Sequence, residues 1–200
     1  MSDMRSTTEF RRIRPLSVAD YDRMGEAGII DPDERVELLN GELLQMPPIG
    51  PAHSKATVTL YDEFRDRFRD RAVMRPQQPI TLSDESEPEP EVVLPRQPAE
   101  RYDDAHPTPA DVLLVVEVAD ATLAFDRSEK LQAYARAGIG EYWIVNVQRR
   151  AVERYREPSC AEYQSVEVFG VDALVATGSL HGRRVSGSAA FHGAIAARTR

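Results

Sequence analysis

The sequence predicts an α/β fold in which a mixed central β-sheet is flanked by helices. Three observations support this fold class. An Asn-Gly dipeptide separates two short apolar runs, the segment 112–118 is almost entirely Val and Leu, and segments with helical spacing of apolar residues lie before and after it. Strands interspersed with helices in this order are typical of a sheet whose faces are covered by helices.

The chain has 200 residues and no internal stretch that is long and polar enough to separate two domains. We therefore expect a flexible N-terminus at residues 1–15 and a single domain at 16–200, which is best supported over 16–157. A hydrophobic share of 42% is ordinary for a globular protein, so a sizeable core is expected.

The first elements are a short helix, a hairpin and a long helix. Ser17 is a suitable N-cap for the first helix. Asn40-Gly41 is the strongest short signal for a two-residue hairpin turn, because both turn positions need positive φ. The second helix is expected from His53 to Asp70, where one apolar face recurs at four-residue spacing (Ala56, Leu60, Phe64 and Phe68).

The middle of the chain contains the predicted centre of the sheet. We expect strands at Ile80–Leu82 and Glu91–Leu94, and then a proline-rich surface loop from Pro95 to Asp111. Val112–Val118 is the most hydrophobic stretch of the chain, which predicts a central strand that is buried on both faces.

The later elements are a helix and several strands. Asp126 and Glu129 resemble a capping box, so a helix is expected to begin at Asp126 and to stop at Gly138. The remaining strands form an antiparallel pair followed by edge strands; they are expected at Tyr142–Val147, Ala151–Arg156, Tyr163–Phe169 and Ala173–Ala176.

The charge and composition exclude several classes of protein. A net charge of −8 argues against a protein that coats nucleic acid with a basic surface, although acidic metal ligands contribute to this charge. A single cysteine cannot form an intramolecular disulfide, which favours a reducing compartment. The longest apolar run, Val112–Val116, is far below the ~20 residues of a membrane helix, so a cytoplasmic location is expected.

Glu117 places a carboxylate inside a strand that is otherwise made of Val and Leu. A buried charge needs a cation, a basic partner or a solvent-lined cleft, unless Glu117 simply reaches water at the strand's end. If the strand that begins at Glu91 pairs beside it, the two carboxylates converge in the way that Mg²⁺ requires of two side-chain ligands.

Lys130 is one of only two lysines among the 25 basic residues. In such an arginine-rich chain, a lysine suggests a place where a compact ammonium orients water or neutralises developing charge. The alternative is that Lys130 is a surface residue without a functional role. Tyr134 lies four residues later on the same helix face, where it either positions Lys130 or belongs to the core.

Several motifs taken together resemble the Uma-two family of restriction-endonuclease-like proteins, within the PD-(D/E)XK nuclease superfamily. The resemblance covers roughly 16–157 and rests on five segments, which are Glu34–Leu43, Glu87–Val93, Val115–Val118, Asp126–Gly138 and Glu141–Val145. The ordered set is much more specific than any one segment.

The resemblance implies a restriction-endonuclease-like core in which Glu91 and Glu117 bind the metal. The superfamily lysine normally lies two residues after the strand glutamate, where this chain has Ala119, and Lys130 on the following helix takes that role. Glu37 resembles the additional N-terminal glutamate of the superfamily, and His53 matches a histidine common at the start of the next helix. There His53 either contacts phosphate or water or only makes a hydrogen bond at the helix start. The first metal ligand of the superfamily is usually Asp, and the side chain of Glu91 is longer than that of Asp by one methylene.

The favoured hypothesis is Mg²⁺-assisted hydrolysis of DNA phosphodiester bonds, with Mn²⁺ as a substitute. Glu91, Glu117, Lys130 and Glu37 are the expected catalytic residues, with His53 and Tyr134 in supporting positions. No membrane partner is expected, and a homodimer would place one site on each DNA strand. The alternative is a nuclease-derived binding or assembly module that no longer cuts. The histidines lack the spacing that zinc sites use.

Overall fold

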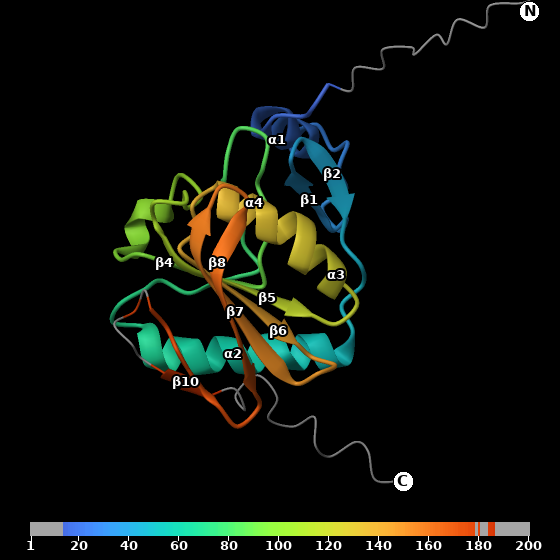
Figure 1. The fold of residues 1–200 in the computed structure, drawn as a ribbon. Helices are drawn as coiled ribbons and strands as arrows, with labels where there is room; N and C mark the ends of the chain where they lie inside the picture. Colours follow the sequence, from blue (N-terminus) through green and yellow to red (C-terminus); the bar gives the residue numbers. More distant parts are fainter. Residues whose placement is uncertain (1–13, 179, 181–183, 187–200) are drawn as a thin grey trace, which may run out of the picture.

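The structure is a computed structural model that describes residues 14–178, 180 and 184–186. Residues 1–13 of the expected flexible N-terminus lie outside the described part. A mixed β-sheet runs through the molecule with helices on both of its faces, as Figure 1 shows. The predicted α/β fold class is thereby confirmed.

The central sheet has six strands in the order β3-β4-β5-β6-β7-β8. Their bounds are β3 Arg75–Pro76, β4 Val92–Pro95, β5 Val112–Ala119, β6 Glu141–Asn146, β7 Ala151–Ser159 and β8 Glu162–Gly170. The pair β5 and β6 is parallel and every other pair is antiparallel. All eight residues of β5 are buried, as expected for the central strand.

Two helical layers cover the sheet. The long helix α2 (Pro51–Phe68) lies along one face (Figure 1). The other face is covered by a helical segment that connects β5 to β6, made of α3 (Leu123–Phe125), a π-helical turn η2 (Asp126–Lys130) and α4 (Leu131–Arg136). Parallel strands need a crossover connection, and this helical segment is the crossover of β5 and β6, the only parallel pair in the described sheet.

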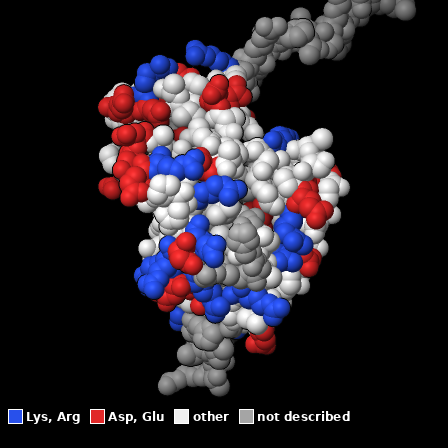
Figure 2. Space-filling view, turned by 90° about the vertical axis from the view of Figure 1, so that its left-hand side faces the viewer, with Lys and Arg blue, Asp and Glu red and all other residues white. Residues whose placement is uncertain are grey.

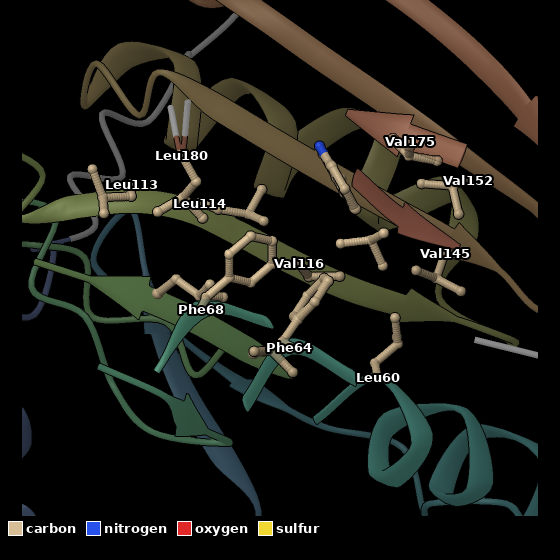
Figure 3. Packing of buried hydrophobic residues seen from close by; sticks show 14 of the residues in the cluster. Leu60, Phe64, Phe68, Leu113, Leu114, Val116, Val145, Val152, Val175 and Leu180 are labelled. Carbon is tan, nitrogen blue, oxygen red and sulfur yellow. The ribbon is translucent and has the colours of Figure 1, made fainter. Parts of the chain in front are cut away.

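The hydrophobic core is divided by the sheet into two clusters. The cluster beneath α2 includes Phe64 and Phe68, which pack on Val116 and Leu114 of β5 (Figure 3). The ring of Phe64 lies 5.9 Å from that of Trp143, centroid to centroid, in an edge-on arrangement. The cluster beneath α4 is rich in tyrosine and includes Tyr134, Tyr142, Tyr155 and Tyr163.

The N-terminal part of the domain adds a helix and a hairpin. Ser17 caps α1 (Val18–Glu26) in a capping box with Asp20, which confirms the predicted N-cap. The hairpin of β1 (Val36–Leu39) and β2 (Glu42–Gln45) turns at Asn40 and Gly41, whose φ angles are 52° and 78°. The two positive φ angles are those that the Asn-Gly signal predicted.

The predicted strand at Ile80–Leu82 is wrong. Its backbone makes loop hydrogen bonds instead, from Ile80 N–H to the Pro88 carbonyl and from Leu82 N–H to the Ser86 carbonyl. Prolines interrupt this region, and a residue without an N–H cannot contribute to a continuous ladder. The predicted surface loop from Pro95 to Asp111 contains one short 3₁₀ helix, η1 (Ala99–Tyr102).

The predicted helix start at Asp126 is also wrong. The helical segment begins at Leu123, and Asp126 lies at its first π turn, where its carboxylate accepts a hydrogen bond from the Thr122 hydroxyl. Asp126 therefore does not cap this helix and lies inside the helical segment. The helix does stop before Gly138, which has a φ of 80°.

The C-terminal strands differ in part from the expectation. Tyr163–Phe169 lies within β8, which is an edge strand of the six-stranded sheet. The segment Ala173–Ala176 does not extend that sheet, because β9 (Leu174–Ala176) pairs with β10 (Arg184–Ser186) in a separate two-stranded sheet. This small sheet closes the core beside α2 through Val175 and Val185.

Charges of both signs lie on the face shown in Figure 2, where Asp and Glu gather at the upper left and Lys and Arg in the lower part. Arginines near the C-terminal end of α2 are paired with neighbouring acids, as in the contact of 3.0 Å between Arg65 and Asp62. The alternating charges of that helix end therefore form a solvated surface. None of the described helices combines the length and apolar character needed to cross a bilayer.

Candidate active site

The candidate site lies where β4 and β5 lie beside the start of α2 and the π turn. The strands pair antiparallel with Val92 opposite Val116, so Glu91 and Glu117 follow directly at the next position of the register. A cavity of about 140 Å³ is lined by both carboxylates and by His53, Asp126 and Lys130. The sequence therefore brings its expected ligands to one cavity by strand pairing.

Lys130 is the centre of the buried charge network. Its ammonium donates to Oε1 of Glu117 at 2.9 Å and lies 3.1 Å from Oε2 of Glu37. Only 1% of the side chain is exposed. Burial disfavours the charged form, but the carboxylates of Glu117, Glu37 and Asp126 outweigh it and raise the pKa of Lys130. The lysine is thus held as an ammonium between two strands and a helix.

Glu117 is held at one oxygen only. Tyr134 donates its hydroxyl to Oε1 at 2.7 Å, and Lys130 donates to the same atom. Burial raises the pKa of Glu117 to about 8 in spite of the neighbouring ammonium. Oε2 has no hydrogen-bond partner among the described residues. One carboxylate oxygen thus remains available in a residue that lines the cavity.

Glu91 is fixed by three donors. His53 Nε2 lies 3.0 Å from Oε1, while the Thr57 hydroxyl and the Gln77 amide donate to Oε2 at 3.3 and 3.1 Å. Burial would raise the pKa of Glu91, but the hydrogen bonds from His53 and Gln77 and the nearby charge of Lys130 lower it. Glu91 is therefore held as a carboxylate in one orientation.

Glu37 lies on β1 and is fully buried. Its Oε2 contacts Lys130 and accepts a hydrogen bond of 3.1 Å from the backbone N–H of Glu89, whereas its Oε1 is buried without a partner. The hairpin thus supplies a second carboxylate to the ammonium. A buried oxygen of this kind can accept a hydrogen bond from a bound water or contact a cation.

All six residues expected from the sequence gather here, and the structure adds others. Asp126 is 2% exposed and lines the cavity four residues before Lys130, a spacing that could have identified it. Thr57 follows His53 by one helical turn, which is a similar signal. Gln77 has a φ of 47° in a loop, and no sequence pattern placed it near Glu91.

The buried charges of the site do not balance. Within the described part of the chain, the site holds four buried carboxyl groups (Glu37, Glu91, Glu117 and Asp126) but only one ammonium, that of Lys130, which contacts Glu37 and Glu117. Uncompensated buried carboxylates are costly, and the raised pKa of Glu117 is one expression of that cost. Among the described residues, no three His, Cys, Asp or Glu side chains are arranged to hold one ion together. A site of two carboxylates with added waters is the arrangement that Mg²⁺ accepts.

Comparison with known proteins identifies a family and a similar solved structure. A family model described as "Uma2: Putative restriction endonuclease" matches residues 18–193. A crystal structure described as "a putative nuclease belonging to DUF820 from Anabaena variabilis" has a TM-score of 0.66 at 16% identity, covering 88% of this chain and 98% of the other. The second match shows a shared fold. No curated protein matches the chain.

Proposed function

Since the chain belongs to the Uma2 family, we propose that it is a metal-dependent endonuclease that hydrolyses phosphodiester bonds in DNA. The observation that carries this proposal is the convergence of Glu91 and Glu117 from paired strands on one cavity beside the buried ammonium of Lys130. Carboxylates suit a hard divalent cation that assists phosphodiester hydrolysis, and a neighbouring ammonium can stabilise the charge that develops on the phosphate.

The residues present fit a divalent cation such as Mg²⁺ or Mn²⁺. Glu91 and Glu117 would hold it, since Glu91 is kept ionised by its hydrogen bonds and Glu117 has one oxygen without a partner. The excess of buried carboxylate over ammonium supports the need for added positive charge. When bound, the ion would polarise the scissile phosphate and lower the pKa of a water molecule.

The remaining residues of the site position these groups. Lys130 supplies an ammonium whose charge can stabilise negative charge that develops on the phosphate. Glu37 and Tyr134 fix the position of that network, Glu37 through Lys130 and Tyr134 through Glu117. His53 fixes the orientation of Glu91. Glu37, Tyr134 and His53 are therefore positioning residues, which act through Lys130 or through a carboxylate.

A second candidate is a nuclease-derived binding module that has lost activity. The specific observation in its favour is that Glu91 already satisfies both of its oxygens with His53, Thr57 and Gln77. A carboxylate with three donors must give up or share some of them when it binds an ion. This candidate predicts no measurable heat when Mn²⁺ is added to the wild-type protein.

The test is calorimetric titration of Mn²⁺ into wild-type protein and the Glu117→Gln variant, with plasmid cleavage followed on the same samples. Both metal binding and cleavage should be lost in Glu117→Gln, while the circular dichroism spectrum is unchanged. Glu162→Gln, which changes an exposed carboxylate on β8, is the matched control and should behave as wild type. Persistent cleavage by folded Glu117→Gln would contradict the proposed role of Glu117.

A further inference from the structure

A groove adjoins the candidate active site on the side of the hairpin. Its volume is about 560 Å³, and Met46, Pro47, Ala121 and Thr122 line both the groove and the cavity. The groove and the cavity are therefore neighbours that share these wall residues. Its size lies within the range of about 300–1,000 Å³ that is usual for ligand sites.

The groove is lined mainly by apolar residues, and the charged residues that line it are acidic. Strand β2 contributes Leu43 and Leu44, and α3 contributes the half-buried ring of Phe125. The described lining residues include Glu42 and Glu129 and no Lys or Arg. A phosphate backbone carries dense negative charge and would be repelled here, whereas an uncharged planar group would not.

Phe125 and Asp126 are consecutive residues that line different compartments. Asp126 lines the cavity that holds the carboxylates, and Phe125 lines the groove. For a DNA strand whose phosphate enters the cavity, the neighbouring groove lined by Phe125 is the place where we expect an adjacent nucleotide to lie. Bases stack on aromatic side chains of this kind, and the Gln45 amide offers both a donor and an acceptor to a base edge.

We propose that the groove between β2 and α3 binds an unpaired nucleobase against Phe125, so that the substrate is DNA with a single-stranded segment next to the scissile phosphate. This inference rests on the proposed nuclease function and specifies its substrate class. A base inside an intact duplex is stacked and paired, so it cannot enter the groove without being unpaired. The lack of a basic lining in the described groove agrees with a site that takes a base and not a duplex backbone.

The test uses the wild-type protein and the Phe125→Leu and Phe125→Trp variants, with Ca²⁺ in place of Mg²⁺. Binding is measured to a single-stranded oligonucleotide and to a blunt duplex of the same length. Phe125→Leu keeps an apolar side chain but removes the aromatic face, so single-strand binding should weaken about tenfold or more. Phe125→Trp should bind as wild type, and a base stacked on the introduced indole should quench its fluorescence. The native Trp143 is buried in the core and should not contribute to this change.

Tyr61→Ala provides the matched control, since Tyr61 is a half-buried aromatic on α2 that does not line the groove. It should leave binding unchanged. Equal affinity of wild-type protein for duplex and single strand, with no effect of Phe125→Leu, would overturn the inference. A dimer of this chain that Phe125→Leu dissociates would also overturn it, because the groove would then be an interface between copies.

The inference and the proposed function fail in different ways. If wild-type protein cleaves plasmid with Mn²⁺ but its single-strand binding does not depend on Phe125, the nuclease function is supported and the nucleobase site is contradicted. If single-strand binding depends on Phe125 but no Mn²⁺ heat or cleavage is seen, the nucleobase site stands in a protein that binds without cutting.

Discussion

Nζ of Lys130 lies 2.9 Å from Oε1 of Glu117 inside the domain, although the lysine comes from the helical layer and the glutamate from the central strand. The ion pair therefore joins the two layers at the point where the chain leaves β5. Removing one partner from a buried pair leaves the other without compensation, which is more costly than the pair itself is stabilising. The pair is thus both a catalytic candidate and a structural connection.

Replacing Lys130 with methionine should lower the free energy of unfolding by about 3–5 kcal/mol, because the buried carboxylates of Glu117 and Glu37 lose their ammonium. The measurement is urea denaturation followed by tryptophan fluorescence. Lys55→Met is the matched control, since Lys55 is the other lysine of the chain and is exposed on α2. Equal stability of both variants would show that the Lys130 contacts are not stabilising.

Replacing Thr57 with valine should weaken Mn²⁺ binding about 10- to 100-fold, the usual range for loss of a group that orients a metal ligand. The physical reason is that the Thr57 hydroxyl donates to Oε2 of Glu91, and valine has a similar shape without a donor. Affinity is measured by calorimetry. Thr59→Val on the same helix removes a hydroxyl that donates to a backbone carbonyl, and it should leave the affinity unchanged.

Replacing Phe64 with alanine should destabilise the domain by about 3–5 kcal/mol, because the ring is fully buried between α2 and the sheet (Figure 3). Thermal unfolding followed by circular dichroism measures the effect. Val58→Ala changes an exposed apolar residue of the same helix and should cost no more than about 0.5 kcal/mol. Similar losses in the two variants would mean that α2 does not pack on the sheet as described.

Alkaline pH should destabilise the domain through its buried tyrosines. Burial, together with the hydrogen bond to Glu153, raises the pKa of Tyr155 from 10.0 to about 12. A raised folded-state pKa gives stability that is fully present below pH 10 and is lost as the pH rises toward 12. Tyr155→Phe should reduce the slope of unfolding free energy against pH in this window. An unchanged slope would show that Tyr155 titrates equally in the folded and unfolded states.

The sequence predicted the elements whose signals are local. The Asn40-Gly41 turn, the Ser17 cap and the buried strand β5 depend on residues within a few positions, and all three lie where expected. The strand at 80–82 was predicted from its composition alone, but the backbone of this segment, which follows Pro79, makes loop hydrogen bonds and pairs with none of the described strands. A local sequence pattern does not show with which other segment a backbone segment forms hydrogen bonds.

The candidate site was also predicted in part. Glu117 is apparent because a carboxylate inside an apolar strand needs an explanation, and Lys130 because lysine is rare in this chain. Asp126 was assigned to a helix cap, since the π turn that places it in the cavity has no sequence signature. Gln77 reaches Glu91 through a loop, which periodicity cannot describe.

The positions of these charged residues in the chain have a consequence for folding during translation. Glu37 comes from the hairpin, Glu91 from the position before β4, Glu117 from β5, and the lysine from the connection to β6. Because chains are translated from the N-terminus, the three glutamates emerge before the cation that neutralises them. Until the residues around Lys130 have been synthesised, we expect these glutamates to remain in water as ordinary ionised side chains. The centre therefore forms late, when the crossover docks on the sheet.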